Sequence, residues 1–451
     1  MVNTAQLLNW DREHIVHSRC LIGENNGIVM NKSHGIYFQD TDGKDYIDGA
    51  SQLICVNLGY GQHEIIEAAL EEMQKLPYGM LFHGFSNTAT IKCGQKLSEL
   101  VPPGLDHFNF TTGGSESIDV AFRLARLYWY TRGQAKYKIV SLYDSYHGVA
   151  FGGLNAAGSG RGFYSRGVTP LMPGFLHIPS YYCYRCSLGL EYPACKVRCA
   201  RFLSEVIEKE GADTIAAFIA EPELGTGGMI APPPEYWPLI REICTKYEIL
   251  LIVDEVMTGF GRTGKMFAVE HWGIKPDIMT LAKGITSAYL PFGAVAFSGD
   301  IWDTLKGKNF VSYTYAGHPV CAAVAIKTME VYIRDQIIDH VTSVGKYALE
   351  RLKKDFEPLP CVGGVSGLGL MLGIEIVANK VTKEPFSPKF SIMQKLQNSA
   401  LEKGLFLRMA DMQGTPSDRI VFAPPLIITI QEIDKALDIL FPLVANLKPE
   451  R

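Results

Sequence analysis

The chain has 451 residues, more than a single hydrophobic core usually supports, so two or more structural units are expected. Its composition, with 47% hydrophobic and 20% charged residues, is that of an ordinary globular protein. The net charge is -4 and acids and bases are mixed along the chain, so no basic stripe indicates a nucleic acid or an anionic membrane as a partner.

The N-terminal segment has no basic region followed by a long apolar run, so neither a signal peptide nor a membrane anchor is expected. The most apolar stretches, such as residues 249–253, are far too short to span a bilayer. We therefore expect a cytoplasmic protein, in which the ten cysteines are reduced thiols unless their spacing indicates otherwise.

Residues 1–60 are predicted to form an N-terminal arm with short strands. The Asp42-Gly43 dipeptide lies between two segments of strand-like pattern and predicts a hairpin. Residues 63–75 then show the apolar spacing of a helix.

From about residue 105 to 300, short apolar strands alternate with helical segments such as 116–130 and 234–247. The predicted strands are 107–110, 138–142, 215–220, 249–253, 278–281 and 293–297. Several of them are apolar throughout, which favours strands buried on both faces of a mainly parallel sheet in an α/β fold.

The pattern changes after about residue 320. A long helix over 320–333 leads to a strand at 371–376 and a last helix over 431–447, which predicts a smaller α+β domain. The predicted organisation is an N-terminal arm with part of the small domain (1–60), a large α/β domain (61–320) and a C-terminal small α+β domain (321–451).

Polar motifs follow the carboxyl ends of the predicted strands, where open α/β sheets bind their ligands. Six segments share this position: 111–116, 145–148, 221–222, 254–256, 283–284 and 314–315. One such motif would mean little, but six of them predict a shared crevice.

The first of these motifs resembles an anion-binding turn. Gly113 and Gly114 allow backbone amides to approach an oxyanion, and the helix that begins near Ser115 points its N-terminus at the same place. Seen alone, the motif is more typical of the glycine-rich entry of a helix with a serine cap.

Asp254 and Lys283 are the two charged residues at buried strand ends. A carboxylate at such a position needs a cationic partner, which a pyridinium nitrogen or Arg262 could supply, or it caps a helix. A desolvated lysine has a lowered pKa and becomes a nucleophile towards carbonyl groups, whereas an ordinary lysine reaches the surface.

Tyr146 and His147 follow another strand. Tyr146 could stack on an aromatic ring or be a core tyrosine, and His147 could orient the ring or be a hydrogen-bonded structural histidine.

Three motifs together resemble the signature of class III aminotransferases, which depend on pyridoxal 5'-phosphate (PLP). They are residues 251–264, residues 281–284 followed by 290–294, and residues 314–319. The resemblance extends from Gly35 to about Ala436. It implies the PLP-dependent transferase fold type I and a homodimer with shared active sites, or a tetramer built from such dimers.

Carried onto this sequence, the resemblance implies that Lys283 is the catalytic residue and holds PLP as a Schiff base. Asp254 would pair with the pyridine nitrogen, and Val256 and Tyr146 would pack on the two ring faces. The other implied cofactor-binding residues are Gly114, Ser115, His147, Glu221 and Thr314, of which Thr314 would come from the partner subunit.

The chain is most similar to the branch that uses ω-amino acids or amines with pyruvate. Arg408 matches the mobile arginine that grips the carboxylate of the keto acid, although it could also be a surface ion pair. Ile54 stands where the branch often has tryptophan, and Ile54 and Phe82 are the other expected substrate contacts.

An insertion carries Cys183, Cys186, Cys195 and Cys199 with the spacing C-x2-C-x8-C-x3-C. This spacing could close a tetrahedral thiolate site for a structural zinc ion, or the four residues could be reduced thiols in a surface loop. The insertion resembles one in taurine:pyruvate aminotransferases, which favours taurine or a similar ω-amino acid as the donor.

The sequence thus predicts a transaminase that moves an amino group from a small-molecule donor (taurine, β-alanine or another amine) to pyruvate, giving alanine. It leaves 2-oxoglutarate open as the acceptor. An aminomutase, racemase or decarboxylase on the same scaffold is the alternative, which Arg408 argues against because an isomerase has less need of a switch between two substrates. A non-catalytic binding protein on this fold is disfavoured by the presence of both Asp254 and Lys283.

Overall fold

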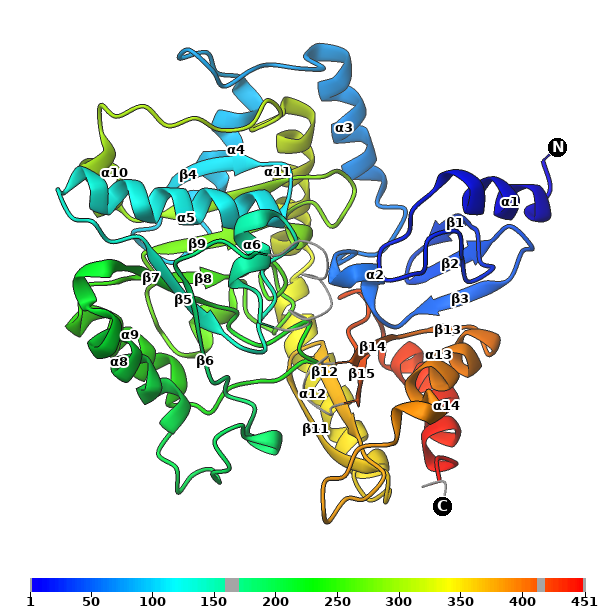
Figure 1. The fold of residues 1–451 in the computed structure, drawn as a ribbon. Coiled ribbons are helices and arrows are strands. Elements are labelled where there is room, and N and C mark those ends of the chain that lie inside the picture. The colour runs from blue at the N-terminus through cyan, green and yellow to red at the C-terminus, as the bar shows by residue number, and fades with distance from the viewer. Residues whose placement is uncertain (1, 159–169, 412–417, 449–451) are drawn as a thin grey trace.

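A computed structural model describes residues 2–158, 170–411 and 418–448. Its centre is a seven-stranded sheet in the order β4-β10-β9-β8-β7-β5-β6, in which only β10 runs against its neighbours (Figure 1). The strands are β4 (His107–Thr111), β5 (Lys138–Leu142), β6 (Phe175–Ile178), β7 (Ile215–Ala220), β8 (Leu250–Asp254), β9 (Ile278–Leu281) and β10 (Gly293–Phe297).

The central strands are apolar throughout because both faces of the sheet are covered. In β8, Leu250 and Ile252 belong to one hydrophobic cluster, and Leu251 and Val253 belong to another. Helices α5 (Gly114–Thr131), α6 (Phe151–Ala156) and α10 (Gly299–Leu305) pack in the first cluster. The second includes α4 (Thr88–Ser98), α8 (Arg198–Glu210), α9 (Tyr236–Lys246) and α11 (Pro319–Arg334).

The smaller part of the molecule contains two four-stranded sheets. An antiparallel sheet has the order β11-β12-β15-β14, and its strands are β11 (Val362–Leu368), β12 (Met371–Ile376), β14 (Arg408–Asp411) and β15 (Asp418–Phe422). Helices α12 (Ile337–Phe356), α13 (Ile392–Glu402) and α14 (Ile430–Ala445) contact these strands or each other.

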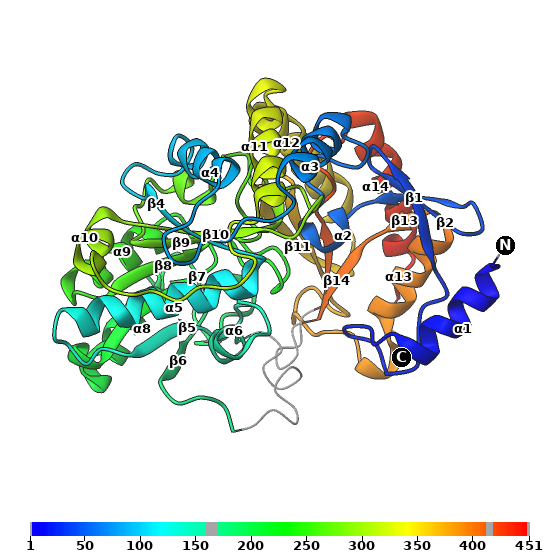
Figure 2. The same ribbon diagram turned by 90° about the horizontal axis from the view of Figure 1, so that it is seen from above.

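The second small sheet joins both ends of the chain. It has the order β1-β2-β3-β13, with β1 (Met30–His34), β2 (Tyr37–Asp40), β3 (Asp45–Asp48) and β13 (Leu405–Phe406). The remaining N-terminal elements are α1 (Thr4–His14), the short α2 (Ser51–Ile54) and α3 (His63–Lys75). Figure 2 shows the large sheet and its helices on one side and this N- and C-terminal part on the other.

The structure confirms the predicted α/β architecture with a mainly parallel sheet and a smaller α+β part. All six predicted strands are present, and the hairpin at Asp42-Gly43 joins β2 to β3. The domain boundaries near residues 60 and 320 stay a prediction. In the part of the chain that the structure describes, no helix has both the length and the apolar character needed to cross a membrane.

One strand of the large sheet was not predicted. β6 lies at the sheet edge, pairs with β5 alone, and three of its four residues are only partly buried. A short edge strand of this kind lacks the continuous apolar run that marks the central strands.

Candidate active site

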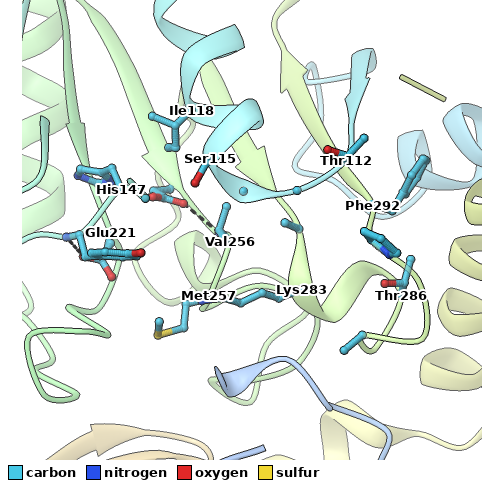
Figure 3. Close-up of a pocket in the computed structure, with 18 of the residues that line it drawn as sticks. Thr112, Ser115, Ile118, His147, Glu221, Val256, Met257, Lys283, Thr286 and Phe292 are labelled. Atoms are coloured by element: carbon cyan, nitrogen blue, oxygen red, sulfur yellow. Dashed lines mark hydrogen bonds and ion pairs between the residues drawn. The ribbon is translucent and has the colours of Figure 1, made fainter. Parts of the chain in front are cut away.

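The carboxyl ends of β5, β7, β8 and β9 open into one pocket of about 430 Å³. A pocket of this size suits a small-molecule ligand or cofactor. Figure 3 shows side chains from these different strand ends pointing into the same space. The lining includes Thr112, Gly113, Gly114, Ser115, Ile118, Tyr146, His147, Gly148, Glu221, Asp254, Val256, Met257, Ala282, Lys283, Thr286, Ala288, Leu290, Pro291 and Phe292.

An anion cradle lies at the start of α5, which begins at Gly114 and runs for 18 residues. The first N–H groups of a helix have no partner within the helix, and its dipole attracts negative charge. A Cβ atom on Gly114 would lie 2.8 Å from Cγ1 of Val256, so a residue with a side chain would collide with Val256 at this position. The cradle is therefore built to accept a group such as a phosphate.

Asp254 is 4% exposed at the end of β8 and is held from three directions. Its Oδ2 lies 2.7 Å from Nδ1 of His147, and its Oδ1 accepts hydrogen bonds from the Thr280 hydroxyl (3.0 Å) and the Val256 amide (3.1 Å). Arg262, one of the partners considered from the sequence, is instead buried against Ser51, Asn57 and backbone carbonyls. The carboxylate is thus fixed in place without an arginine.

Lys283 follows β9 and opens a short 3-10 turn with φ of 47°, in the left-handed region. The pKa of its amine is lowered to about 8, chiefly by burial and also by the positive charge of Arg408, which together outweigh the raising effect of Cys55 and Asp254. In Figure 3 its side chain runs across the pocket below Val256. A substantial fraction of this amine is therefore neutral near pH 8.

Glu221 is a second buried acid at the end of β7. Its carboxylate accepts hydrogen bonds from the amides of Tyr146 (2.8 Å) and Gly225 (2.9 Å). Burial nevertheless raises the pKa of Glu221 to about 7. The acid thereby fixes the loop that carries Tyr146 beside the pocket.

Four of the residues expected at the site do not line this pocket in the single chain. Thr314 is exposed, and its carbonyl accepts a hydrogen bond from Tyr78 (2.9 Å). Ile54 is buried in a cluster with Met257, a residue of the pocket wall, and Phe82 is partly buried. Arg408 lies on β14, near enough for its charge to act on Lys283.

Sequence reasoning missed Thr280, a direct partner of Asp254. The register of the parallel pair β8 and β9 sets these two residues opposite each other. Thr280 is the one polar residue in the apolar strand Ile278–Leu281, and that isolated hydroxyl was the available signal. Met257, Thr286 and Phe292 in the pocket wall carried no comparable signal.

The four cysteines of the insertion lie close together, away from this pocket, and all are free thiols. Among the residues that the structure describes, no group of three or more His, Cys, Asp or Glu side chains is already arranged to hold a metal ion. A closed zinc site is therefore not present in this side-chain arrangement.

The fold and this pocket together define a PLP-dependent transferase, and the comparisons identify its family. The sequence matches the Aminotransferase class-III family over residues 22–444, so the chain belongs to that family. It is 35% identical to a putrescine–pyruvate aminotransferase of Pseudomonas aeruginosa, over 92% of this chain and 90% of the relative. It is 34% identical to a diaminobutyrate–2-oxoglutarate transaminase of Halomonas elongata, over 96% and 95%.

Solved structures give the same result. An (S)-enantioselective omega-transaminase from Thermomicrobium roseum superimposes with a TM-score of 0.93 at 40% sequence identity, covering 99% of both chains. A transaminase from the marine bacterium Virgibacillus gives a TM-score of 0.91 at 37% identity, over 97% of this chain and 98% of the other.

The pocket fits PLP, the cofactor of this family. It offers an anion cradle at Gly114 and Ser115 for a phosphate, a fixed carboxylate at Asp254 for a ring nitrogen, and a desolvated amine at Lys283 for an aldehyde. All three groups line one pocket, so a single small molecule could contact each of them.

Proposed function

We propose that this enzyme moves an amino group from an ω-amino acid or amine to pyruvate, giving alanine, with Lys283 as the catalytic residue. Taurine and β-alanine are the proposed donors, and the proposed setting is the cytoplasm. The observation that carries this proposal is the amine of Lys283 in the same desolvated pocket as the carboxylate of Asp254.

Each polar group of the pocket has a task in this reaction. The amides at Gly114 and Ser115 would bind the phosphate, and Tyr146 and Val256 would contact the flat ring. Asp254 keeps a proton on the ring nitrogen, and His147 and Thr280 fix the orientation of that carboxylate. When bound, PLP supplies an aldehyde and a ring that accepts electrons from the donor carbon.

Lys283 is the group that moves protons. Its neutral amine accepts the proton from the amine-bearing carbon of the donor and returns a proton during the reverse half-reaction with the keto acid. Desolvation supports this role because it lowers the pKa of the amine to about 8, close to the working pH. Glu221 holds the loop of Tyr146 against the ring.

Arg408 is the proposed clamp for the carboxylate of pyruvate. A guanidinium binds a carboxylate through two parallel hydrogen bonds, and its charge reaches Lys283 in this structure. Ile54 and Phe82 would complete the substrate side of the pocket. Taurine and β-alanine carry an anionic group at the end remote from the amine, so the same arginine could receive either donor.

We also propose a homodimer in which the segment containing Thr314 completes the pocket of the partner. Two segments in contact with each other, near Tyr78 and Tyr315, expose large apolar side chains on this chain: Tyr78, Phe85, Val311 and Tyr315. An exposed apolar patch of this kind suits an interface with a second copy. Light scattering coupled to size exclusion should give twice the chain mass, and a monomeric yet active enzyme would contradict the shared site.

The test of the reaction is a panel of donors against two acceptors. Taurine, β-alanine, putrescine and a simple aliphatic amine are each paired with pyruvate and with 2-oxoglutarate, and alanine and glutamate are measured. The proposal expects alanine from pyruvate with at least one ω-amino acid. Formation of glutamate without alanine would show that 2-oxoglutarate, and not pyruvate, is the acceptor. Rearrangement or decarboxylation of every donor without alanine would overturn the proposal.

A further inference from the structure

The insertion between β6 and α8 gathers four thiols around one small cavity. Cys183, Cys186, Cys195 and Cys199 all line this cavity, which has a volume of about 20 Å³. That is roughly the space of one water-sized guest, so the cavity can hold a single small ion but not an organic ligand. Most of the remaining wall is aromatic or aliphatic, including Leu188, Leu190 and Tyr192.

The four thiols line the same small cavity, which places them in a single group. A thiol that coordinates a zinc ion loses its proton to the solvent and binds the metal as a thiolate.

We propose that Cys183, Cys186, Cys195 and Cys199 bind one Zn²⁺ ion as a structural tetrathiolate site. The spacing C-x2-C-x8-C-x3-C brings two pairs of ligands together, as in structural zinc sites, and the cavity leaves no open position for a substrate. Among the residues that the structure describes, these thiols are not already arranged to hold a metal ion, so their side chains must move closer together to bind it.

The ion would fix a loop that connects the two parts of the molecule. In this loop Arg185 donates a hydrogen bond to Glu375 of β12 (2.9 Å) and another to the carbonyl of Lys383 (2.6 Å). Tyr182 also donates a hydrogen bond to Glu375. Between its turns the loop has only one short 3-10 segment, Cys183–Arg185, so it has little regular structure to hold these contacts.

Glu375 also connects this loop to the strand next to the proposed substrate arginine, Arg408. Arg419 of β15 binds the other oxygen of Glu375 (2.8 Å), and β15 pairs with β14, the strand of Arg408. The zinc site is therefore a positioning element for the small antiparallel sheet, separate from the pocket that contains Lys283.

The experiment is metal analysis of the full-length holoenzyme. The protein purified without chelator should contain about one Zn²⁺ per chain, as a four-thiolate site requires. Cys186→Ser and Cys195→Ser should each lose the bound zinc and lower the thermal unfolding temperature. Cys20→Ser, which changes a partly exposed thiol outside the cluster, should keep both values. Lys283→Ala should also keep its zinc, because the metal is independent of the reaction.

A second measurement covers the case in which the serine variants fail to fold. Metal-free wild-type protein is titrated with Co²⁺ under reducing conditions, and the expected result is the intense visible and near-ultraviolet absorption of tetrahedral cobalt thiolate. Reduced wild-type protein that takes up neither Zn²⁺ nor Co²⁺ would overturn the proposal. Mass-spectrometric detection of disulfides among these four cysteines in the native protein would overturn it as well.

Discussion

The floor of the pocket and its substrate side are built in different ways. The floor consists of strand ends of the large sheet, where Asp254 is buried and held by three hydrogen bonds. The proposed substrate side consists of the four-residue strand β14 and the distorted turn α2, in which Ser51, Gln52 and Ile54 have positive φ angles. The comparison teaches that the groups proposed for the chemistry are fixed by the sheet, whereas the residues proposed for substrate choice stand on short segments outside that sheet.

The largest effect is expected on the floor. Lys283→Ala removes the proposed proton acceptor and should reduce turnover by about 10⁴-fold, the upper range for acid–base catalysis. Lys209→Ala, which changes an exposed lysine on α8, is the matched control and should retain full activity. The measurement is steady-state alanine formation, and an active Lys283→Ala enzyme would contradict the assignment.

The second-largest effect is expected from changing Asp254, which also belongs to the floor of the pocket. Asp254→Asn keeps the shape of the side chain but removes its charge, and kcat should fall by about 10²–10³-fold. Thr280→Val removes one hydrogen bond to Asp254, worth about 1 kcal/mol, and should reduce kcat only severalfold. If the threonine variant lost as much activity as the asparagine variant, the charge of Asp254 would not be the important property.

The substrate side should respond more selectively. Arg408→Ala removes charge-assisted hydrogen bonds and should raise the KM for pyruvate roughly 10–100-fold, with a smaller change for a donor that has no carboxylate. Arg408→Lys keeps the charge but not the planar fork and should recover part of the loss. Half-reactions measured separately by stopped flow provide the test, and equal losses in both would refute the clamp.

The smallest expected effect concerns pH. Burial lowers the pKa of Lys283 to about 8. The amine is therefore mainly protonated below that pH and mainly neutral above it. Because only the neutral amine attacks an aldehyde, cofactor capture by the apoenzyme should accelerate about tenfold between pH 7 and pH 9 and then level off. An increase that continues towards pH 10.5 would show an ordinary, solvated lysine.

The sequence predicted the floor well because local patterns encode it. The apolar runs marked the central strands, and the polar residues after those strands, such as Asp254 and Lys283, fall in one pocket. Partnerships across the chain could not be predicted in the same way. His147 and Asp254 are 107 residues apart, and Arg262 was considered as a partner of Asp254 because nothing local shows that it binds carbonyls near Ala423. Such pairs depend on strand order, which the sequence pattern does not give.

The position of Arg408 shows the same limit. Its motif predicted a role for this residue, but its nearness to Lys283 depends on β14 joining β15 in a sheet formed far from β9 along the chain. The sequence therefore predicted a residue for the substrate side, which stays a prediction, whereas the position of that residue relative to Lys283 required the tertiary structure.

The most direct test of the account is to identify the lysine that binds the cofactor. Holoenzyme is reduced with borohydride, which fixes the bound PLP to its lysine, and the digested protein is mapped by mass spectrometry. The account predicts that the pyridoxyl label is carried by Lys283. A label on any other lysine, with Lys283 unmodified, would contradict it.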